Sequence, residues 1–461
     1  MRSHWLEQAL AAESDVAAAL EGENRADVCI VGGGYAGLWA ALEIKRAEPS
    51  MDVALVEADI CGGGASGRNA GYLVDLWVQF PMMKRMFGTD EALRLCRASE
   101  AATGEIRDFC AENSIDAQFR TEGWLWSAGT QAQLGAWNSV IDELAQHQVR
   151  VFEVWDRERI RTETCLASEL AGAYHRSLAT VQPALLARGL RQAAIDRGVR
   201  IFERSPMLRL ERRRPPQVHT PAGRISAERV VLTMNASSLT LPELRSAIVI
   251  VGADMAATPP VPERLAELGW TDGPAVVDSN TFSSFFRTTP DGRIVVGRGG
   301  GRLNFGYRLH DHFDSSSPRT DALRAILARI HPSLSDIPFA TSWSGPIDRT
   351  RSGLPLFGRL STCPDVFYGY GYSGNGIVPA RLGGRILSAL VGATDDEWAN
   401  CGLVRPVTQD FPPEPIRYIG ASMVHKAIER KDRLNDEGRR VGPFTRRMAA
   451  LGPASFKPVT R

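Results

Sequence analysis

The chain has 461 residues and a formal net charge of +1, with 44% hydrophobic and 23% charged residues. A chain of this length exceeds what one hydrophobic core normally supports, so we expect at least two domains in an ordinary globular enzyme. The near-zero charge excludes a whole-molecule field that would attract nucleic acid, and no apolar run reaches the ~18 residues of a membrane span. The seven cysteines form no Cys-x-x-Cys pair, and the first 26 residues carry acids and no apolar core. We therefore expect a cytoplasmic protein with reduced thiols and no signal peptide.

An apolar strand and a glycine-rich turn open the first predicted unit. Residues 28–31 form an apolar run suited to a buried parallel strand, and Gly32, Gly34 and Gly37 follow it in a Gly-x-Gly-x-x-Gly pattern. Such glycines allow a tight turn and the close approach of a pyrophosphate, which the amides at a helix N-terminus stabilise. We expect the phosphates of a dinucleotide to contact Gly32, Gly34, Tyr35, Ala36 and Gly37.

A second apolar strand, "DVALVE", ends in Glu57, 20 residues after Gly37. An acid at this position accepts hydrogen bonds from a ribose 2′-hydroxyl. An acid in place of an arginine favours an adenosine ribose without a 2′-phosphate, as in FAD or NAD.

The next segment, "CGGGASGRNAGYLVDLW" at residues 61–77, holds a second glycine cluster. Glycine destabilises helices and strands, so five glycines within eleven residues indicate unusual backbone angles or a very close neighbour. An NAD domain needs no such cluster directly after the ribose acid, and the segment therefore favours FAD. The contact residues expected here are Ala65, Ser66, Arg68, Asn69 and Gly71.

With "VGGGYAGL", Glu57 and "GASGRNAG" at residues 64–71, the chain resembles the FAD-dependent D-amino-acid oxidase superfamily. It is most similar to the branch that holds glycine oxidase, sarcosine oxidase and gamma-glutamylputrescine oxidase. The resemblance implies an α/β fold with a discontinuous Rossmann-like FAD-binding domain and a substrate domain with a mostly antiparallel sheet. The expected FAD-binding domain comprises residues 24–100, 176–240 and 335–400. The substrate domain comprises residues 101–175 and 241–334, and residues 401–461 form a basic C-terminal extension.

A last glycine loop, "GYGYSGNGI" at residues 369–377, resembles the family segment that lies against the flavin. The resemblance implies flavin contacts from Gly374, Asn375, Gly376 and Ile377. Some relatives attach the flavin through a histidine where this chain has Asn69, and others use a cysteine. Because the nearest cysteine here, Cys363, lies in a separate loop, we expect non-covalent FAD.

The chemistry that follows from bound flavin is oxidation of a small primary or secondary amine or amino acid. Hydride passes from the substrate to flavin N5, the imine is hydrolysed, and oxygen or another acceptor takes the electrons. No acid–base pair is required, and the sequence shows no decisive catalytic motif. Six arginines are candidate anchors for an anionic substrate group: Arg287, Arg298, Arg302, Arg308, Arg349 and Arg351.

Among these arginines we favour Arg302 and Arg351, and we expect Tyr372 to close the pocket. Sarcosine oxidases place an oxygen-activating lysine above the flavin, and Asn304 takes its place here by resemblance. That departure favours a flavin dehydrogenase. A further alternative is a biosynthetic oxidase for an unusual amine such as an aminophosphonate. The segment "HDH" at residues 310–312 lacks further ligands, so no metal site is expected.

The C-terminal extension is basic, with ten Lys or Arg residues against four Asp or Glu between residues 425 and 461. Residues 417–440 suit a helix with Ile419, Met423 and Ile428 on one side. Such a helix either packs on the body or contacts anionic lipid or a redox partner. In the second case the protein could be a non-catalytic flavoprotein subunit. A nucleic-acid partner is not expected, because the extension lacks interleaved aromatic residues.

Overall fold

The computed structural model describes residues 2–11, 13 and 17–452. Its first sheet is parallel in its middle, where apolar strands such as β2 (Val53–Val56) are buried on both faces. The strand order is β17 (Leu356–Leu360), β18 (Cys363–Tyr370), β11 (Gly223–Leu232), β1 (Gly22–Val31), β2 and β8 (Arg200–Phe202). Two short strands, β9 (Arg209–Glu211) and β10 (Gln217–His219), extend β11 on one side.

The second sheet is antiparallel except for one parallel pair, β13 with β4. Its order is β16 (Thr341–Thr350), β12 (Ile248–Ala257), β15 (Ile294–Arg298), β14 (Ser284–Thr288), β13 (Ala275–Asp278), β4 (Trp124–Ala128), β6 (Ala171–His175) and β5 (Glu153–Asp156). A small ladder of β3 (Tyr72–Leu73) and β7 (Ala179–Thr180) lies apart from both sheets. The expected α/β fold with a second, mostly antiparallel sheet is confirmed.

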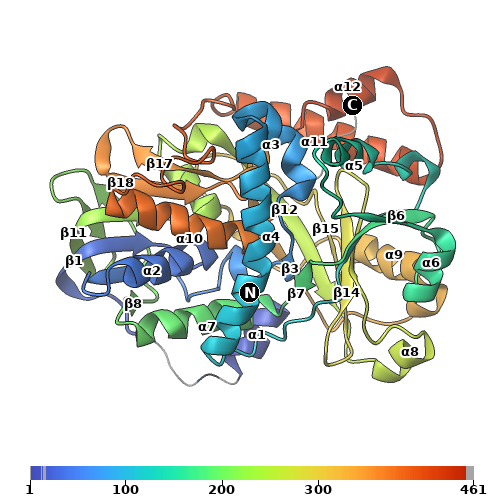
Figure 1. The fold of residues 1–461 in the computed structure, drawn as a ribbon, viewed down its shortest axis with the longest axis horizontal. Coiled ribbons are helices and arrows are strands. Elements are labelled where there is room, and N and C mark those ends of the chain that lie inside the picture. Colours follow the sequence, from blue (N-terminus) through green and yellow to red (C-terminus); the bar gives the residue numbers. More distant parts are fainter. Residues whose placement is uncertain (1, 12, 14–16, 453–461) are drawn as a thin grey trace.

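Helices cover the near face of the parallel sheet, and the second sheet lies to its right (Figure 1). Helix α2 (Tyr35–Ala47) packs against α10 (Ile377–Gly392) and α7 (Pro183–Asp196), and α10 also contacts the long helix α4 (Thr89–Glu112). The remaining helices before the C-terminal region are α1 (His4–Leu10), α3 (Phe80–Phe87), α5 (Asn138–Ala145), α6 (Arg157–Glu163), α8 (Pro262–Glu267) and α9 (Thr320–Ile330). None of the helices in the described ranges is both long enough and apolar enough to cross a bilayer.

The strands of the first sheet come from the three stretches expected for the FAD-binding domain, but the third stretch also supplies a strand of the second sheet. Strand β16 lies within residues 335–400, yet it pairs with β12 of the second sheet over ten residues, from Ile248 opposite Thr350 to Ala257 opposite Thr341. The third stretch therefore contributes to both sheets.

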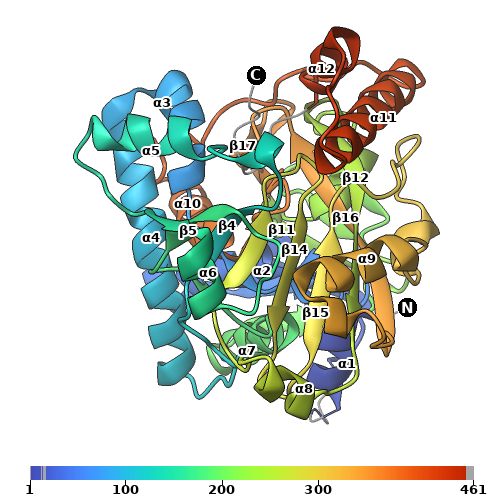
Figure 2. The ribbon, with the colours of Figure 1, turned by 90° about the vertical axis from the view of Figure 1, so that its right-hand side faces the viewer.

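The C-terminal extension is folded onto the body as helices α11 (Ile416–Asp436) and α12 (Pro443–Ala449), which lie above the second sheet (Figure 2). Ile428 and Ala449 are buried with Phe282 in a small core. The expectation that Ile419, Met423 and Ile428 share one side was wrong. Ile428 is 4% exposed, whereas Ile419 and Met423 are 56% and 53% exposed. At about 100° per residue, Ile428 lies half a turn around the helix from Ile419.

Candidate functional site

A cavity of about 510 Å³ lies between the two sheets. The carboxyl ends of β1, β2 and β11 form one part of its wall through Gly32, Glu57 and Thr233. Ligands of open parallel sheets bind at this end of the strands. Residues of the second sheet, among them Met255, Phe285 and Ile347, form the other part. The cavity therefore joins a nucleotide-binding edge to an antiparallel wall.

The turn between β1 and α2 can be built only with glycine. Gly32 has φ +112°, and a Cβ there would lie 2.6 Å from the carbonyl oxygen of Thr233. A Cβ on Gly37 would lie 2.0 Å from the carbonyl oxygen of Gly32. The turn brings Tyr35 and Ala36, the first residues of α2, to the cavity wall. The helix thus points its amide end at the cavity, where a phosphate would be stabilised.

Glu57 follows β2 and lines the cavity, as expected for a ribose acid. Its Oε2 accepts a hydrogen bond from the amide of Gly33 at 2.6 Å, and its Oε1 accepts one from the amide of Asp59 at 3.0 Å. Burial raises the pKa of the carboxyl group, and these two amides oppose that shift. The side chain is fixed by backbone donors with its carboxyl group at the wall.

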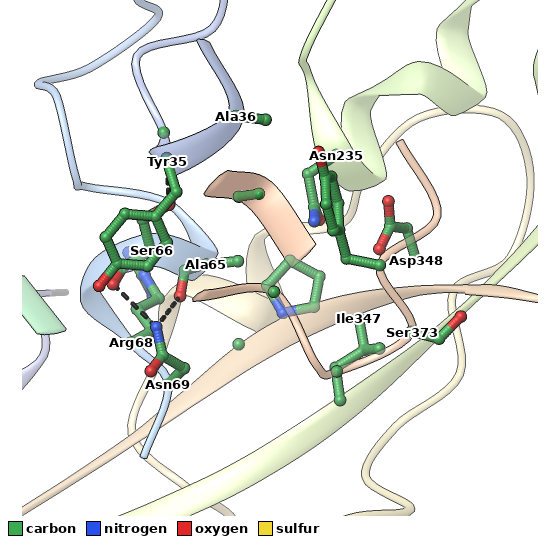
Figure 3. A pocket seen from close by; sticks show the side chains of 18 of the residues that line it. Tyr35, Ala36, Ala65, Ser66, Arg68, Asn69, Asn235, Ile347, Asp348 and Ser373 are labelled. Carbon is green, nitrogen blue, oxygen red and sulfur yellow. Dashed lines mark hydrogen bonds between the residues drawn. The ribbon is translucent and has the colours of Figure 1, made fainter. Parts of the chain in front are cut away.

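The second glycine cluster is organised by Asn69 and Ser66 (Figure 3). The Asn69 amide nitrogen donates to the carbonyl oxygens of Ala65 (3.1 Å) and Ser66 (2.9 Å), and its oxygen accepts from the Gly71 amide at 2.7 Å. The Ser66 hydroxyl accepts from the Tyr35 amide at 2.9 Å, which joins the cluster to the start of α2. Ala65, Ser66 and Asn69 all line the cavity.

Arg68 lines the cavity as well, and its guanidinium ties the glycine cluster to the second sheet. Its Nε donates to the Gly63 carbonyl at 2.9 Å, and one terminal nitrogen donates to the carbonyls of Phe313 (3.2 Å) and Ser344 (3.3 Å). The other terminal nitrogen pairs with Asp314. Arg68 therefore helps to fix the shape of the cavity wall, whether or not it also contacts a ligand.

The loop before α10 forms the far wall through Gly374, Asn375, Gly376 and Ile377. Asp348 on β16 holds this loop, because its carboxylate accepts from the Gly371 amide at 2.5 Å. Burial raises the pKa of Asp348 to about 7. Tyr372 also lines the cavity, and its buried hydroxyl has no hydrogen-bond partner among the described residues.

Gly37 and Gly71 do not line the cavity and serve packing instead. A Cβ on Gly71, which has φ +77°, would lie 2.1 Å from the Val181 carbonyl oxygen and 2.8 Å from Arg287. Arg287 donates to the carbonyls of Ala70 and Val181. It therefore holds these two neighbouring backbone segments together and does not face the cavity. All the other residues expected to bind the cofactor lie on the cavity wall: Gly32, Gly34, Tyr35, Ala36, Glu57, Ala65, Ser66, Arg68, Asn69, Gly374, Asn375, Gly376 and Ile377.

The favoured substrate-side residues differ in where they lie. Arg302 and Arg351 are exposed and stand outside the set of residues that line the cavity. Asn304 is buried, but its amide donates to the backbone carbonyl of Arg308 at 3.0 Å and its oxygen accepts from the His310 amide at 3.1 Å. It shapes the 304–310 loop away from the cavity. Of the four residues favoured for substrate or oxygen, only Tyr372 faces the cavity.

Arg349, one of the six candidate arginines, lies on the cavity wall although the sequence did not favour it over the others. Its side chain is half-buried on the wall formed by β16, and desolvation lowers its pKa to about 10. Among the described residues, no group forms a hydrogen bond or a salt bridge with its guanidinium, and the charge of Asp348 opposes only part of the pKa shift. Thr281 and Ser283, from the loop between β13 and β14, also line the cavity and carried no sequence signal.

These features fit an adenine dinucleotide that carries a flavin. A glycine turn and a helix N-terminus suit the pyrophosphate, and the fixed Glu57 carboxylate suits a ribose. A Cβ added to Gly374, which has φ +92°, would have only Ile347 within 4 Å, so flat groups can approach the backbone there. The residues present therefore fit FAD.

Comparison with known proteins agrees with this geometry. A family model described as FAD dependent oxidoreductase matches residues 27–390. Gamma-glutamylputrescine oxidoreductase of Escherichia coli (strain K12) is 30% identical over 372 residues, which are 79% of this chain and 83% of that protein. The crystal structure of glycine oxidase from Geobacillus kaustophilus superimposes with a TM-score of 0.68 at 22% identity, covering 84% of this chain and 100% of that one. Iminodiacetate oxidase from Chelativorans sp. BNC1 gives a TM-score of 0.65 at 19% identity, covering 83% and 100%.

The two solved structures share the fold. The family model and the Escherichia coli relative carry the assignment, and they confirm the resemblance given by the glycine motifs. The chain belongs to the D-amino-acid-oxidase-like family of FAD-dependent oxidoreductases.

Proposed function

We propose that the protein oxidises a small amine or amino acid whose anionic group is bound by Arg349. The names of similar proteins refer to gamma-glutamylputrescine, glycine and iminodiacetate, each an amine that also carries a carboxylate. The observation that carries the proposal is Arg349, which lines the cavity and whose guanidinium has no hydrogen-bonded or salt-bridged partner among the described residues, Asp348 acting on it only through its charge. A desolvated guanidinium is costly unless an anion satisfies it, and its fork suits a carboxylate or a phosphonate.

A separate part of the cavity wall is apolar and suits the amine end of such a substrate. Met255, Val277 and Phe285 of the second sheet and Tyr72 of β3 give this part an apolar surface, and the rings of Tyr72 and Phe285 meet edge to face at 6.2 Å. An apolar wall excludes water and favours the neutral amine over the ammonium form, which oxidation at the α carbon requires. Bound FAD supplies the acceptor for the hydride that leaves that carbon.

We propose that the cofactor is held without a covalent bond. The cavity wall contains neither histidine nor cysteine among the described residues, and Asn69 is committed to the backbone of its own loop. Acid precipitation of the purified protein should release all of the yellow colour into the supernatant. Flavin retained in the pellet would contradict this part of the proposal.

The substrate proposal is tested by anaerobic mixing of the purified protein with glycine, sarcosine, gamma-glutamylputrescine and aminomethylphosphonate. We expect at least one of them to bleach the flavin, and readmission of air then separates an oxidase, which regains its colour quickly, from a dehydrogenase. Comparison of the three carboxylates with aminomethylphosphonate shows which kind of anionic group the site accepts. A protein whose flavin none of these amines reduces would contradict the proposed function and favour a non-catalytic flavoprotein.

Replacement of Arg349 tests the anchor. Arg349→Met should raise KM for anionic amines roughly 10- to 100-fold, because a hydrogen bond to a charged group contributes about 1.5–3 kcal/mol, while the flavin content stays unchanged. Arg351→Met, two residues along the chain but exposed, is the matched comparison and should leave KM near the wild-type value. The reverse pattern would overturn the placement, and loss of flavin from Arg349→Met would assign Arg349 to the cofactor.

A further inference from the structure

Helix α11 lies beyond residue 390, where the family match ends, and it packs on loops of the second sheet (Figure 2). One of these loops, residues 279–283, joins β13 to β14 and sends Thr281 and Ser283 to the cavity wall. The other follows β15 and contributes Gly299 to the same wall. Only the residues of these two loops therefore lie between the extension and the cavity.

Buried carboxylates hold the amides of loop 279–283 from two directions. Asp278, at the end of β13, accepts from the amides of Asn280 at 3.2 Å and Ser284 at 3.0 Å. Asp432 of α11 accepts from the amides of Thr281 at 3.3 Å and Phe282 at 2.8 Å. The Asp432 side chain is 0% exposed. Without α11, the two middle amides of this loop would lack these acceptors.

The same helix fixes the second loop through His425. Its Nε2 lies 3.0 Å from the carbonyl oxygens of both Gly300 and Gly301, and since carbonyls only accept, Nε2 carries the proton. The His425 ring also packs against Phe282 at a centroid distance of 4.7 Å. Both loops are thus set by one helix.

Lys431 determines which way the hydroxyl proton of Thr281 points. Its ammonium group donates to the Thr281 hydroxyl oxygen at 2.6 Å. An ammonium group has no acceptor, so the Thr281 hydroxyl proton points away from Lys431. No described residue accepts that proton, and Thr281 lies on the cavity wall.

We propose that α11 completes the substrate end of the cavity, with Thr281 as a hydrogen-bond donor to the bound anion. Asp432 positions the backbone of Thr281, and Lys431 orients its hydroxyl and strengthens it as a donor. This assignment rests on the proposed function only in calling the ligand a substrate. It makes the C-terminal extension part of ligand recognition.

The positioning role is tested on the FAD-loaded protein without any substrate. Hydrogen exchange followed by mass spectrometry should show faster exchange of the amides of residues 280–283 in Asp432→Ala. Asp432→Asn, which retains one acceptor oxygen, should recover part of the protection. Lys426→Met, on the exposed face of α11, is the control and should exchange as wild type. Equal exchange in Asp432→Ala and wild type would overturn the positioning role.

The donor role is tested by titrating acetate, methylphosphonate and neutral acetamide into the FAD-loaded protein and following the visible flavin spectrum. Thr281→Val should weaken the binding of the anionic probes about tenfold, Thr281→Ser should restore it, and Lys431→Met should weaken it by a smaller factor. Flavin content should be equal in all variants. A wild-type spectrum that responds to no probe, or equal affinity in Thr281→Val, would overturn the donor role. Failure of the proposed function would instead show as a flavin that no amine reduces.

Discussion

Asp348 is a buried carboxyl group whose protonation should affect stability near neutral pH. Burial raises its pKa in the folded protein from 3.8 to about 7. The protonated Asp348 therefore contributes its full stabilisation below the unfolded-state pKa of 3.8. This stabilisation is lost as the pH rises through the folded-state pKa of about 7. The wild-type protein should therefore lose stability from this group between pH ~4 and ~7, by up to about 1.4 kcal/mol per pH unit.

Urea unfolding of wild type and Asp348→Asn from pH 5 to pH 8 tests this expectation. The variant should lose less stability than the wild type as pH rises, because its amide does not ionise, and the two curves should run parallel above pH ~7. Asp272→Asn, at an exposed position, serves as the control and should follow the wild type. Curves of equal slope for Asp348→Asn and wild type would contradict the assignment.

Individual residues differ in how well the sequence predicts their role. Gly32 and Glu57 could be placed because a turn and a strand end fix them within a short stretch of chain. Arg349 could not, since the side of β16 that meets the cavity depends on the pairing of β16 with β12, about 90 residues earlier in the chain. The same pairing leaves Arg351 just past the strand end, where its side chain is exposed.

We expect cofactor binding to depend most directly on the glycine turn between β1 and α2. Gly37→Ala should prevent the turn from closing, because its Cβ would lie 2.0 Å from the Gly32 carbonyl oxygen. We expect this variant to be purified without flavin, measured as the ratio of absorbance at about 450 nm to that at 280 nm.

Gly104→Ala, within α4, is the matched control for this variant. The nearest atom to its Cβ is 4.0 Å away, on the flexible Arg107 side chain, so the variant should keep its flavin and gain about 0.5–1 kcal/mol from helix propensity. A fully flavin-loaded Gly37→Ala protein would contradict the role of the turn.

At the level of elements, the sequence predicted those that local periodicity and capping define. The strand, turn, helix and strand from β1 to β2 belong to this class. Helix α11 was predicted as well, but its buried face was not. That face is chosen by the polar groups Lys431, Asp432 and His425, which contact loops about 125–150 residues away, and hydrophobic spacing does not report such contacts.

Across the whole molecule, FAD should act as a clamp between the two sheets. The cavity wall exists only when both are folded, so FAD binds the folded state and stabilises it by mass action. Adding FAD at 100 times its Kd to cofactor-free protein should contribute about 2.7 kcal/mol, seen as a rise in Tm. NAD, which lacks the flavin end, is the control and should produce a smaller shift. An equal shift with both dinucleotides would contradict the FAD-specific role of the second glycine cluster.

The order of strands in the first sheet has a consequence for how the protein is made. Strand β1 lies between β2 and β11, and β11 in turn pairs with β18, which ends at Tyr370. During synthesis the first glycine turn leaves the ribosome long before these partner strands have been made. Loop 279–283 gains its contacts with α11 only after residue 436 has been added. We therefore expect the complete cofactor site to form only after almost the entire chain has been translated. The supply of free FAD then determines how long the newly made protein remains in its less stable form.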